Sequence, residues 1–284
     1  MKTRKLPQPR KLAGAALLWL ASVAGPVMAD TSYAFGVVPQ FEARRLSEIW
    51  TPILDELEKR VGIDLRFQGS PKIPEFERAF ARGEFDISYM NPYHALVALD
   101  SQGYQPIIRD GDRQLFGVLI VRKDSDYQKV SDLQGARIAF PAPNALGASL
   151  LMRAELDRQH GLDFTADYVN THTSAYLNVV LGDADAAGGV MGTFNRLDPA
   201  IREHLRVIYK TAPVPPHPIV VHPRVPSEVA TRIQDAFLDL AATPEGAELL
   251  AQVPIRNAVK TDISEYQMLR DFKLEDYYVA IDEK

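Results

Sequence analysis

Cysteine is absent from the chain of 284 residues. Its absence excludes disulfide bonds, thiolate metal sites, a thiol nucleophile and the cysteine-linked lipid anchor of some exported proteins. The HExxH, GxSxG, GxGxxG and glycine-rich phosphate-loop patterns are also missing. The common sequence signals of metalloproteases, serine hydrolases and nucleotide-binding enzymes are therefore not found. We predict no catalytic residue, no metal ligand and no cofactor.

The first 29 residues differ in composition from the rest of the chain. Basic residues occupy positions 2, 4, 5, 10 and 11 without any acidic residue, and an apolar run follows from Leu12 to Ala24. Pro26 and small residues up to Ala29 complete the pattern of a Sec signal peptide. We predict cleavage after Ala29 and a periplasmic mature protein. The alternative is an uncleaved N-terminal anchor, for which the apolar run is short.

The predicted mature chain is strongly acidic. Residues 30–284 contain 27 Lys and Arg against 37 Asp and Glu, a net charge of −10. This charge argues against nucleic acid as a partner, and no later apolar run is long enough for membrane insertion. An anionic ligand must then be bound locally, by backbone N–H groups or a few side chains.

Short apolar segments alternate with amphipathic segments along residues 32–274, which predicts an α/β protein. β-Branched and apolar runs predict strands, whereas apolar residues three and four positions apart predict helices. The expected strands are 32–38, 64–67, 85–89, 116–121, 137–140, 167–170, 186–190, 205–209 and 219–221. The expected longer helices are 43–61, 74–82, 92–100, 148–160, 175–181, 227–241, 244–252 and 264–274.

This alternation starts again after about residue 122, which predicts two α/β lobes. Lobe 1 comprises residues 30–120 and 222–284, and lobe 2 comprises residues 121–221. Two crossing strands, at 117–122 and 218–222, form the expected hinge, and the interface between such lobes is a favoured place for a ligand. A single large doubly wound sheet is the alternative.

Several segments carry a resemblance to a known family. They are Phe85–Tyr93 (FDISYMNPY), Leu119–Ser125 (LIVRKDS), Asp132–Phe140 (DLQGARIAF) and Asp183–Ala187 (DADAA). In order and spacing they resemble the phosphonate/phosphite-binding family of periplasmic solute-binding proteins of ABC transporters. The resemblance covers nearly all of the mature chain and implies the type II periplasmic binding-protein fold.

The family resemblance also implies a function and its partners. It implies capture of a small oxyanion, such as phosphate, phosphite or a phosphonate, by a monomer that docks on an ABC permease. A periplasmic partner that presents its ligand to a sensor histidine kinase is the alternative. A secreted enzyme built on the same fold is the third hypothesis.

Three strand-to-helix junctions offer backbone N–H groups for an anion. In the family, the first carries an Asn-Ser-Thr-Ser-Gly run whose hydroxyls and amides hold the phosphonate oxygens. Here Asn144 matches, Ala145, Leu146 and Gly147 replace the hydroxyl residues, and Ser149 is the nearby hydroxyl. Each lost hydrogen bond to a charged group is worth roughly 1.5–3 kcal/mol. We therefore predict that these residues bind a ligand, but not a phosphonate in the family's usual way; a turn with an Asn cap is the alternative.

The second and third junctions add four candidate ligand-binding residues. Tyr89 and Asn91 end an expected strand, although Asn91 before Pro92 is also a plain helix cap. His172 matches a histidine that the family places at the start of a helix in the second lobe, and Thr173 follows it. The alternatives are a structural hydrogen bond for His172 and a capping role for Thr173.

His217 is the last candidate and the clearest departure from the family. In aminophosphonate binders of the family, the matching position is an Asp that pairs with the ligand's ammonium. The run here is Pro-Pro-His-Pro-Ile-Val, without a carboxylate. We predict an oxyanion or carboxylate ligand that lacks an amine. The alternative places His217 on the surface of a proline-rich loop.

Overall fold

Two separate β-sheets organise the chain in the computed structural model, which describes Met1 and residues 32–281. The predicted α/β class is confirmed, and the single large sheet is wrong. The predicted signal peptide lies outside the described residues. No helix in the described part of the chain is long and apolar enough to cross a membrane.

The first sheet has six strands in the order β11-β4-β10-β3-β1-β2. The strand β1 pairs in parallel with β2 and β3, whereas β10 is antiparallel to β3 and β4, and β11 is antiparallel to β4. The bounds are β1 (Ser32–Val37), β2 (Asp64–Gly69), β3 (Ile87–Tyr89), β4 (Gln105–Asp110), β10 (Ile219–Val221) and β11 (Ala258–Lys260).

The second sheet has five strands in the order β7-β6-β8-β5-β9. Here β6 pairs in parallel with β7 and β8, and β5 runs antiparallel to β8 and β9. The bounds are β5 (Gly117–Arg122), β6 (Arg137–Phe140), β7 (Thr165–Tyr168), β8 (Ala186–Val190) and β9 (Leu205–Lys210).

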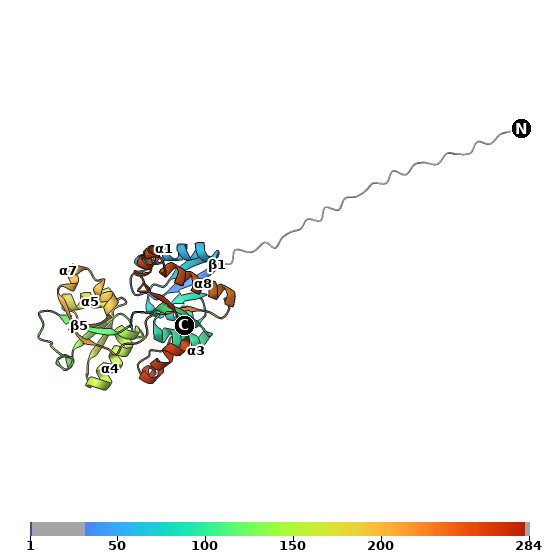
Figure 1. The fold of residues 1–284 in the computed structure, drawn as a ribbon. Helices are drawn as coiled ribbons and strands as arrows, with labels where there is room; N and C mark the ends of the chain where they lie inside the picture. The colour runs from blue at the N-terminus through green and yellow to red at the C-terminus, as the bar shows by residue number, and fades with distance from the viewer. Residues whose placement is uncertain (2–31, 282–284) are drawn as a thin grey trace. The chain divides into compact units, whose positions relative to one another are not determined.

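Each sheet packs against its own set of helices, as Figure 1 shows for α1, α3 and α8 and for α4, α5 and α7. The helices of the first set are α1 (Ala43–Val61), α2 (Ile73–Ala81), α3 (Pro92–Gln102), α8 (Ser227–Ala241) and α9 (Pro244–Leu250), followed by 3₁₀ turns η3 (Ile263–Phe272) and η4 (Leu274–Asp276). Those of the second set are the 3₁₀ turn η1 (Val130–Leu133), the π-turn η2 (Leu146–Leu150), α4 (Leu151–His160), α5 (His172–Leu181), α6 (Met191–Asn195) and α7 (Pro199–Arg202).

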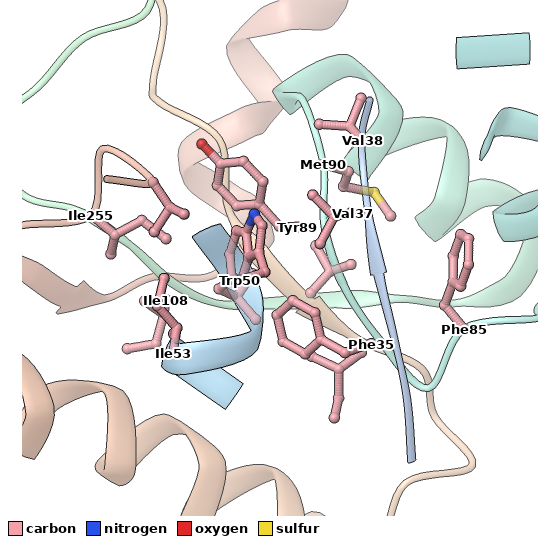
Figure 2. Close-up of a cluster of buried hydrophobic side chains, with 14 of the residues drawn as sticks. Phe35, Val37, Val38, Trp50, Ile53, Phe85, Tyr89, Met90, Ile108 and Ile255 are labelled. Atoms are coloured by element: carbon pink, nitrogen blue, oxygen red, sulfur yellow. The ribbon is translucent and has the colours of Figure 1, made fainter. Parts of the chain in front are cut away.

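The core under the first sheet is built around Trp50 of α1. Apolar residues three and four positions apart bury one face of this helix, which ends at Gly62 in the left-handed conformation that glycine adopts without strain. The Trp50 ring lies 5.1 Å from Phe35 on β1 and 5.1 Å from Tyr89 on β3. Figure 2 shows this contact, which holds Tyr89 in place at the end of β3.

The chain passes twice between the sheets, at residues 111–116 and 211–218. These passages bond to each other, because Leu115 and Val214 exchange two backbone hydrogen bonds of 2.9 and 2.8 Å. The segments 117–122 and 218–222, expected as crossing strands, correspond to β5 and β10, and each of these pairs within one sheet only. We propose that the two lobes exchange at these passages, a few residues before the predicted crossings.

Two strands, β4 and β11, were not predicted from the sequence. The strand β4 contains Pro106 although it lies between two others, and proline normally disfavours such a position. A register shift between Ile219 and Val220 in the partner strand accompanies it. The strand β7 begins and ends two residues earlier than the predicted strand 167–170. The predicted helix 264–274 is a run of 3₁₀ turns.

Close backbone contacts seat η2 against the second sheet. A Cβ atom on Gly117 would lie 1.9 Å from the Gly147 carbonyl oxygen, and one on Gly188 would lie 2.1 Å from that of Ala148. Real Cβ atoms do not approach this closely, so β5 and β8 need glycine where η2 crosses them. The π-turn itself is a rare geometry that often occurs at functional sites.

The substitution Gly117→Ala is expected to lower the free energy of unfolding by about 1–3 kcal/mol, because η2 must move away from β5. Urea unfolding measures this change. Gly192→Ala is the matched control, since nothing lies within 4 Å of a Cβ there, and a change within about 0.5 kcal/mol is expected. Equal stability of the Gly117→Ala variant and the native protein would contradict the close packing of η2.

Candidate functional site

A pocket lies where η2, the start of α5 and the passage before β10 meet the first sheet. The space among its lining atoms is about 300 Å³, part of it open to solvent. The lining residues are Val38, Gln40, Ile73, Asn91, Leu115, Ala145, Leu146, Gly147, Ala148, His172, Val190 and His217. The pocket therefore collects Val190 of the second sheet, residues that follow β1 and β3 of the first sheet, and residues from all three predicted junctions.

Backbone N–H groups are the first set of donors in this pocket. The amides of Leu146, Gly147 and Ala148 begin η2, where no preceding turn can accept their hydrogens. None of them has a hydrogen-bond acceptor among the described residues, whereas Ser149 and Leu150 both donate to the Ala145 carbonyl. Three adjacent amides with unused hydrogens at a helix start favour an anion.

His172 is the first of two buried imidazoles that line the pocket. It is 4% exposed at the start of α5, and its Nδ1 lies 3.3 Å from Thr193 Oγ1. Its Nε2 has no partner in the described part of the chain. The single hydroxyl hydrogen of Thr193 goes either to the Val190 carbonyl, at 2.9 Å, or to His172 Nδ1. In the second arrangement the imidazole hydrogen sits on Nε2, where an oxyanion can accept it. Burial lowers the pKa of His172 to about 4, so the ring is neutral at pH 7.

His217 is the second imidazole, and it is buried rather than on the surface of a loop. Its ring stacks on Tyr89 at 5.2 Å, and its Nε2 lies 3.2 Å from Gln40 Nε2. Because an amide nitrogen only donates, the hydrogen of a neutral His217 then sits on Nδ1. Burial, with smaller contributions from the nearby His94 and His172, lowers the pKa of His217 to about 3.

Asn91 lines the pocket, but its side chain is committed to structure. Its Oδ1 accepts from the backbone N–H of His94 and caps α3, as the alternative interpretation had it. Its Nδ2 lies 3.0 Å from His94 Nδ1 and donates to the Asn144 carbonyl at 3.3 Å. His94 Nε2 in turn lies 2.9 Å from Glu77, so a buried network holds this edge of the pocket.

Tyr89 lines an adjoining pocket rather than this one, and three predicted residues line neither. Asn144 exchanges two hydrogen bonds with the backbone of Val279, at 2.8 and 2.9 Å, which ties down the C-terminal segment. The hydroxyl of Ser149 accepts from Arg153 at 3.3 Å in a fully buried position. Thr173 is half-buried outside both pockets, and Thr171, not Thr173, caps α5.

The sequence interpretation missed several lining residues. Gln40 lies three residues after the end of β1, so its place after a strand was a usable signal. Leu115 and Val190 are ordinary apolar residues, and only the paths of the passages bring them here. The missed pair Arg113 and Arg196 lines the adjoining pocket.

Acidic side chains are excluded from this region. Within residues 32–281, neither pocket is lined by Asp or Glu. The described residues also contain no group of three or more His, Asp or Glu side chains placed to hold a metal ion. The pocket thus offers hydrogen-bond donors without a counter-charge, which suits an anion and disfavours a cation.

Comparison with known proteins identifies a family, a relative in sequence and solved structures that share the fold. The family described as "ABC transporter, phosphonate, periplasmic substrate-binding protein" matches residues 35–266. The phosphonates-binding periplasmic protein of Escherichia coli (strain K12) is 24% identical, over 92% of this chain and 83% of that protein.

Solved structures of low sequence identity share the fold. A binding protein component of an ABC phosphonate transporter from Pseudomonas aeruginosa superposes with a TM-score of 0.79 at 19% identity, over 86% of both chains. A protein from Prochlorococcus marinus in complex with methylphosphonate gives a TM-score of 0.80 at 15% identity, over 88% of this chain and 100% of that chain. The predicted type II periplasmic binding-protein fold is confirmed.

Acidification from about pH 6.5 to about pH 5 is expected to lower the free energy of unfolding by roughly 1 kcal/mol per pH unit for each buried imidazole. An unfolded histidine takes up a proton near pH ~6.5, whereas the native pKa values are about 4 for His172 and about 3 for His217. The unfolded chain therefore binds more protons across this window. Stability present above the unfolded pKa is lost as the pH falls.

Urea unfolding at several pH values measures this slope. His217→Gln is expected to reduce the slope by the contribution of one imidazole. The control His204→Gln, at an exposed position, is expected to keep the native slope. The same slope in both variants would show that His217 is not held neutral by burial.

Proposed function

The chain belongs to the family of periplasmic substrate-binding proteins of phosphonate ABC transporters, and we propose that it binds its oxyanion in the pocket at η2. One observation carries the proposal: three unused backbone amides and two neutral buried imidazoles line a space without any acidic side chain. This arrangement supports a phosphonate, phosphite or phosphate group as the ligand.

Backbone donors compensate for the hydroxyl side chains that this chain lacks. The amides of Leu146, Gly147 and Ala148 need no side chain to donate, and the rigid seat of η2 against Gly117 and Gly188 orders them before the ligand arrives. The ligand would then be held differently from the usual mode of the family, as the loop sequence predicts. Of the predicted ligand-binding residues, we propose Ala145, Leu146, Gly147, His172 and His217 for direct contact with the ligand.

A bound anion changes the electrostatics of the two imidazoles. Next to a phosphonate, the cationic form of His172 or His217 gains a partner, so the pKa of each ring rises from its low value in the empty pocket. Ligand binding then favours proton uptake, and the affinity increases towards lower pH until the ligand itself protonates. The acidic exterior does not oppose this local attraction strongly, because salt screens distant charges.

We further propose that the protein hands its ligand to an ABC permease in the periplasm and does not transform it. The lining residues include no pair of nucleophile and base that would support turnover. The comparisons give no support for the sensor-kinase alternative. Cleavage after Ala29 and a monomeric state complete the proposal.

The oxyanion preference is tested by isothermal titration calorimetry with methylphosphonate, phosphite, phosphate and 2-aminoethylphosphonate. Methylphosphonate is expected to bind more tightly than 2-aminoethylphosphonate, because no carboxylate lines the pocket to pair with an ammonium group. His217→Asp is expected to shift the ratio of the two affinities towards the aminophosphonate by about 10–100-fold, the value of a hydrogen bond to a charged group.

His204→Asp is the control, because it adds the same charge at an exposed position outside the pocket at η2. Its affinity ratio should match that of the native protein. Tightest binding of 2-aminoethylphosphonate by the native protein would contradict the proposed ligand chemistry, and binding of none of the four would contradict the proposed function.

A further inference from the structure

A second pocket adjoins the first and carries two guanidinium groups. The space among its lining atoms is about 540 Å³, part of it open to solvent. The lining residues are Gln40, Tyr89, Arg113, Gln114, Leu115, Val190, Gly192, Thr193, Arg196, Pro216, His217 and Pro254. Four of them, Gln40, Leu115, Val190 and His217, also line the first pocket. A ligand held in the first pocket can therefore extend into the second.

Neither arginine has an acidic partner in the described part of the chain. Arg113 is exposed on the first passage between the sheets and makes no hydrogen bond or ion pair with residues 32–281. Arg196 is half-buried after α6, and its Nη2 donates to the Ala251 carbonyl at 2.7 Å, without a carboxylate within ion-pair distance among those residues. Other arginines of the described residues do form ion pairs, such as Arg109 with Glu265.

Burial and like charge both act on Arg196. Burial lowers its pKa, and the nearby cations Arg113 and Arg45 act in the same direction, while Tyr89 opposes them. Cations that crowd together without a carboxylate raise the local positive potential. An anion placed between the two guanidinium groups relieves this repulsion.

Tyr89 adds a neutral donor to the same space. Its ring is 3% exposed and held between Trp50 and His217, at 5.1 and 5.2 Å. Figure 2 shows the hydroxyl directed away from the Trp50 and Phe35 rings. Burial raises the pKa of Tyr89 well above its usual value, so the hydroxyl keeps its hydrogen. It has no hydrogen-bond partner within residues 32–281, although it belongs to a buried residue, and it lines the second pocket.

We propose that Arg113, Arg196 and Tyr89 form a second anion subsite, so that the preferred ligand is a phosphonate carrying a carboxylate on its carbon chain. The inference rests on the proposed function, because it takes the first pocket as the site of the phosphonate group. Guanidinium groups bind carboxylates in bidentate geometry, so this subsite suits the carboxylate end of the ligand. An ammonium group would be repelled there, and an apolar group would leave both cations without a partner.

The test compares phosphonoacetate and methylphosphonate by isothermal titration calorimetry on the native protein, Arg113→Gln and Arg196→Gln. Each substitution is expected to weaken phosphonoacetate by about 10–100-fold, the range of a hydrogen bond to a charged group. Methylphosphonate, which has no second anionic group, is expected to change by less than about threefold, the residual effect of one distant screened charge.

Arg232→Gln is the matched control, because this guanidinium also donates to a backbone carbonyl, that of Val61, and lies outside both pockets. It should leave both affinities unchanged. Since Arg113 is exposed, its variant keeps the test valid even if Arg196→Gln does not fold, which thermal unfolding reveals.

Unchanged phosphonoacetate binding in the Arg113 and Arg196 variants would overturn the subsite. An equal loss of affinity for both ligands would overturn it as well, because the arginines would then attract any anion through long-range electrostatics and would not contact the carboxylate. Failure of the native protein to bind either ligand would contradict the proposed function itself, a result distinct from loss of the subsite alone.

Discussion

Direct backbone packing of η2 on the second sheet is the constraint on which the site depends. Gly117 on β5 and Gly188 on β8 leave no room for a side chain, so the carbonyls of Gly147 and Ala148 rest on the strands themselves. With these carbonyls turned to the sheet, the first amides of η2 line the pocket without an intramolecular acceptor. Ala145 and Ala148 also hold η2 in place, because they pack into the buried cluster that contains Phe35 and Tyr89.

An acidic protein that binds an anion must keep its negative charges away from the binding site. The separation is achieved here by excluding acidic side chains from both pockets and burying the donors. Neutral imidazoles and backbone amides supply hydrogens at little electrostatic cost in the empty state, whereas a fixed buried cation would need a partner at all times. Arg113 is exposed, so solvent screens its charge until a ligand arrives, whereas Arg196 is half-buried and donates to the Ala251 carbonyl.

Much of the architecture could be predicted, because apolar periodicity marks most strands and helices. The exceptions are β4, which carries a proline inside the sheet, and β11, a short strand at its edge. Neither shows the apolar pattern of a strand, and pairing with β10 and β4 stabilises them. For a similar reason, we propose that the lobes exchange a few residues before the predicted crossings. Pairing with strands far away in the sequence places β5 in the second sheet and β10 in the first, and no local sequence pattern predicts such pairing.

Local sequence determined the three strand-to-helix junctions, the lack of carboxylate at His217 and the family, since each depends on residue type and order along the chain. Tertiary structure alone decided which side chains meet. Asn144 and Ser149 carry the right chemistry, yet the backbone of Val279, far along the chain, occupies the amide of Asn144. Ser149 is fully buried outside both pockets, where it accepts a hydrogen bond from Arg153. Arg113 and Arg196 show no local signal, and only the return of the chain between the two sheets places them beside Tyr89. Hydrogen-bonding capacity is written in the sequence, but whether a group keeps that capacity for a ligand depends on the neighbours that folding brings to it.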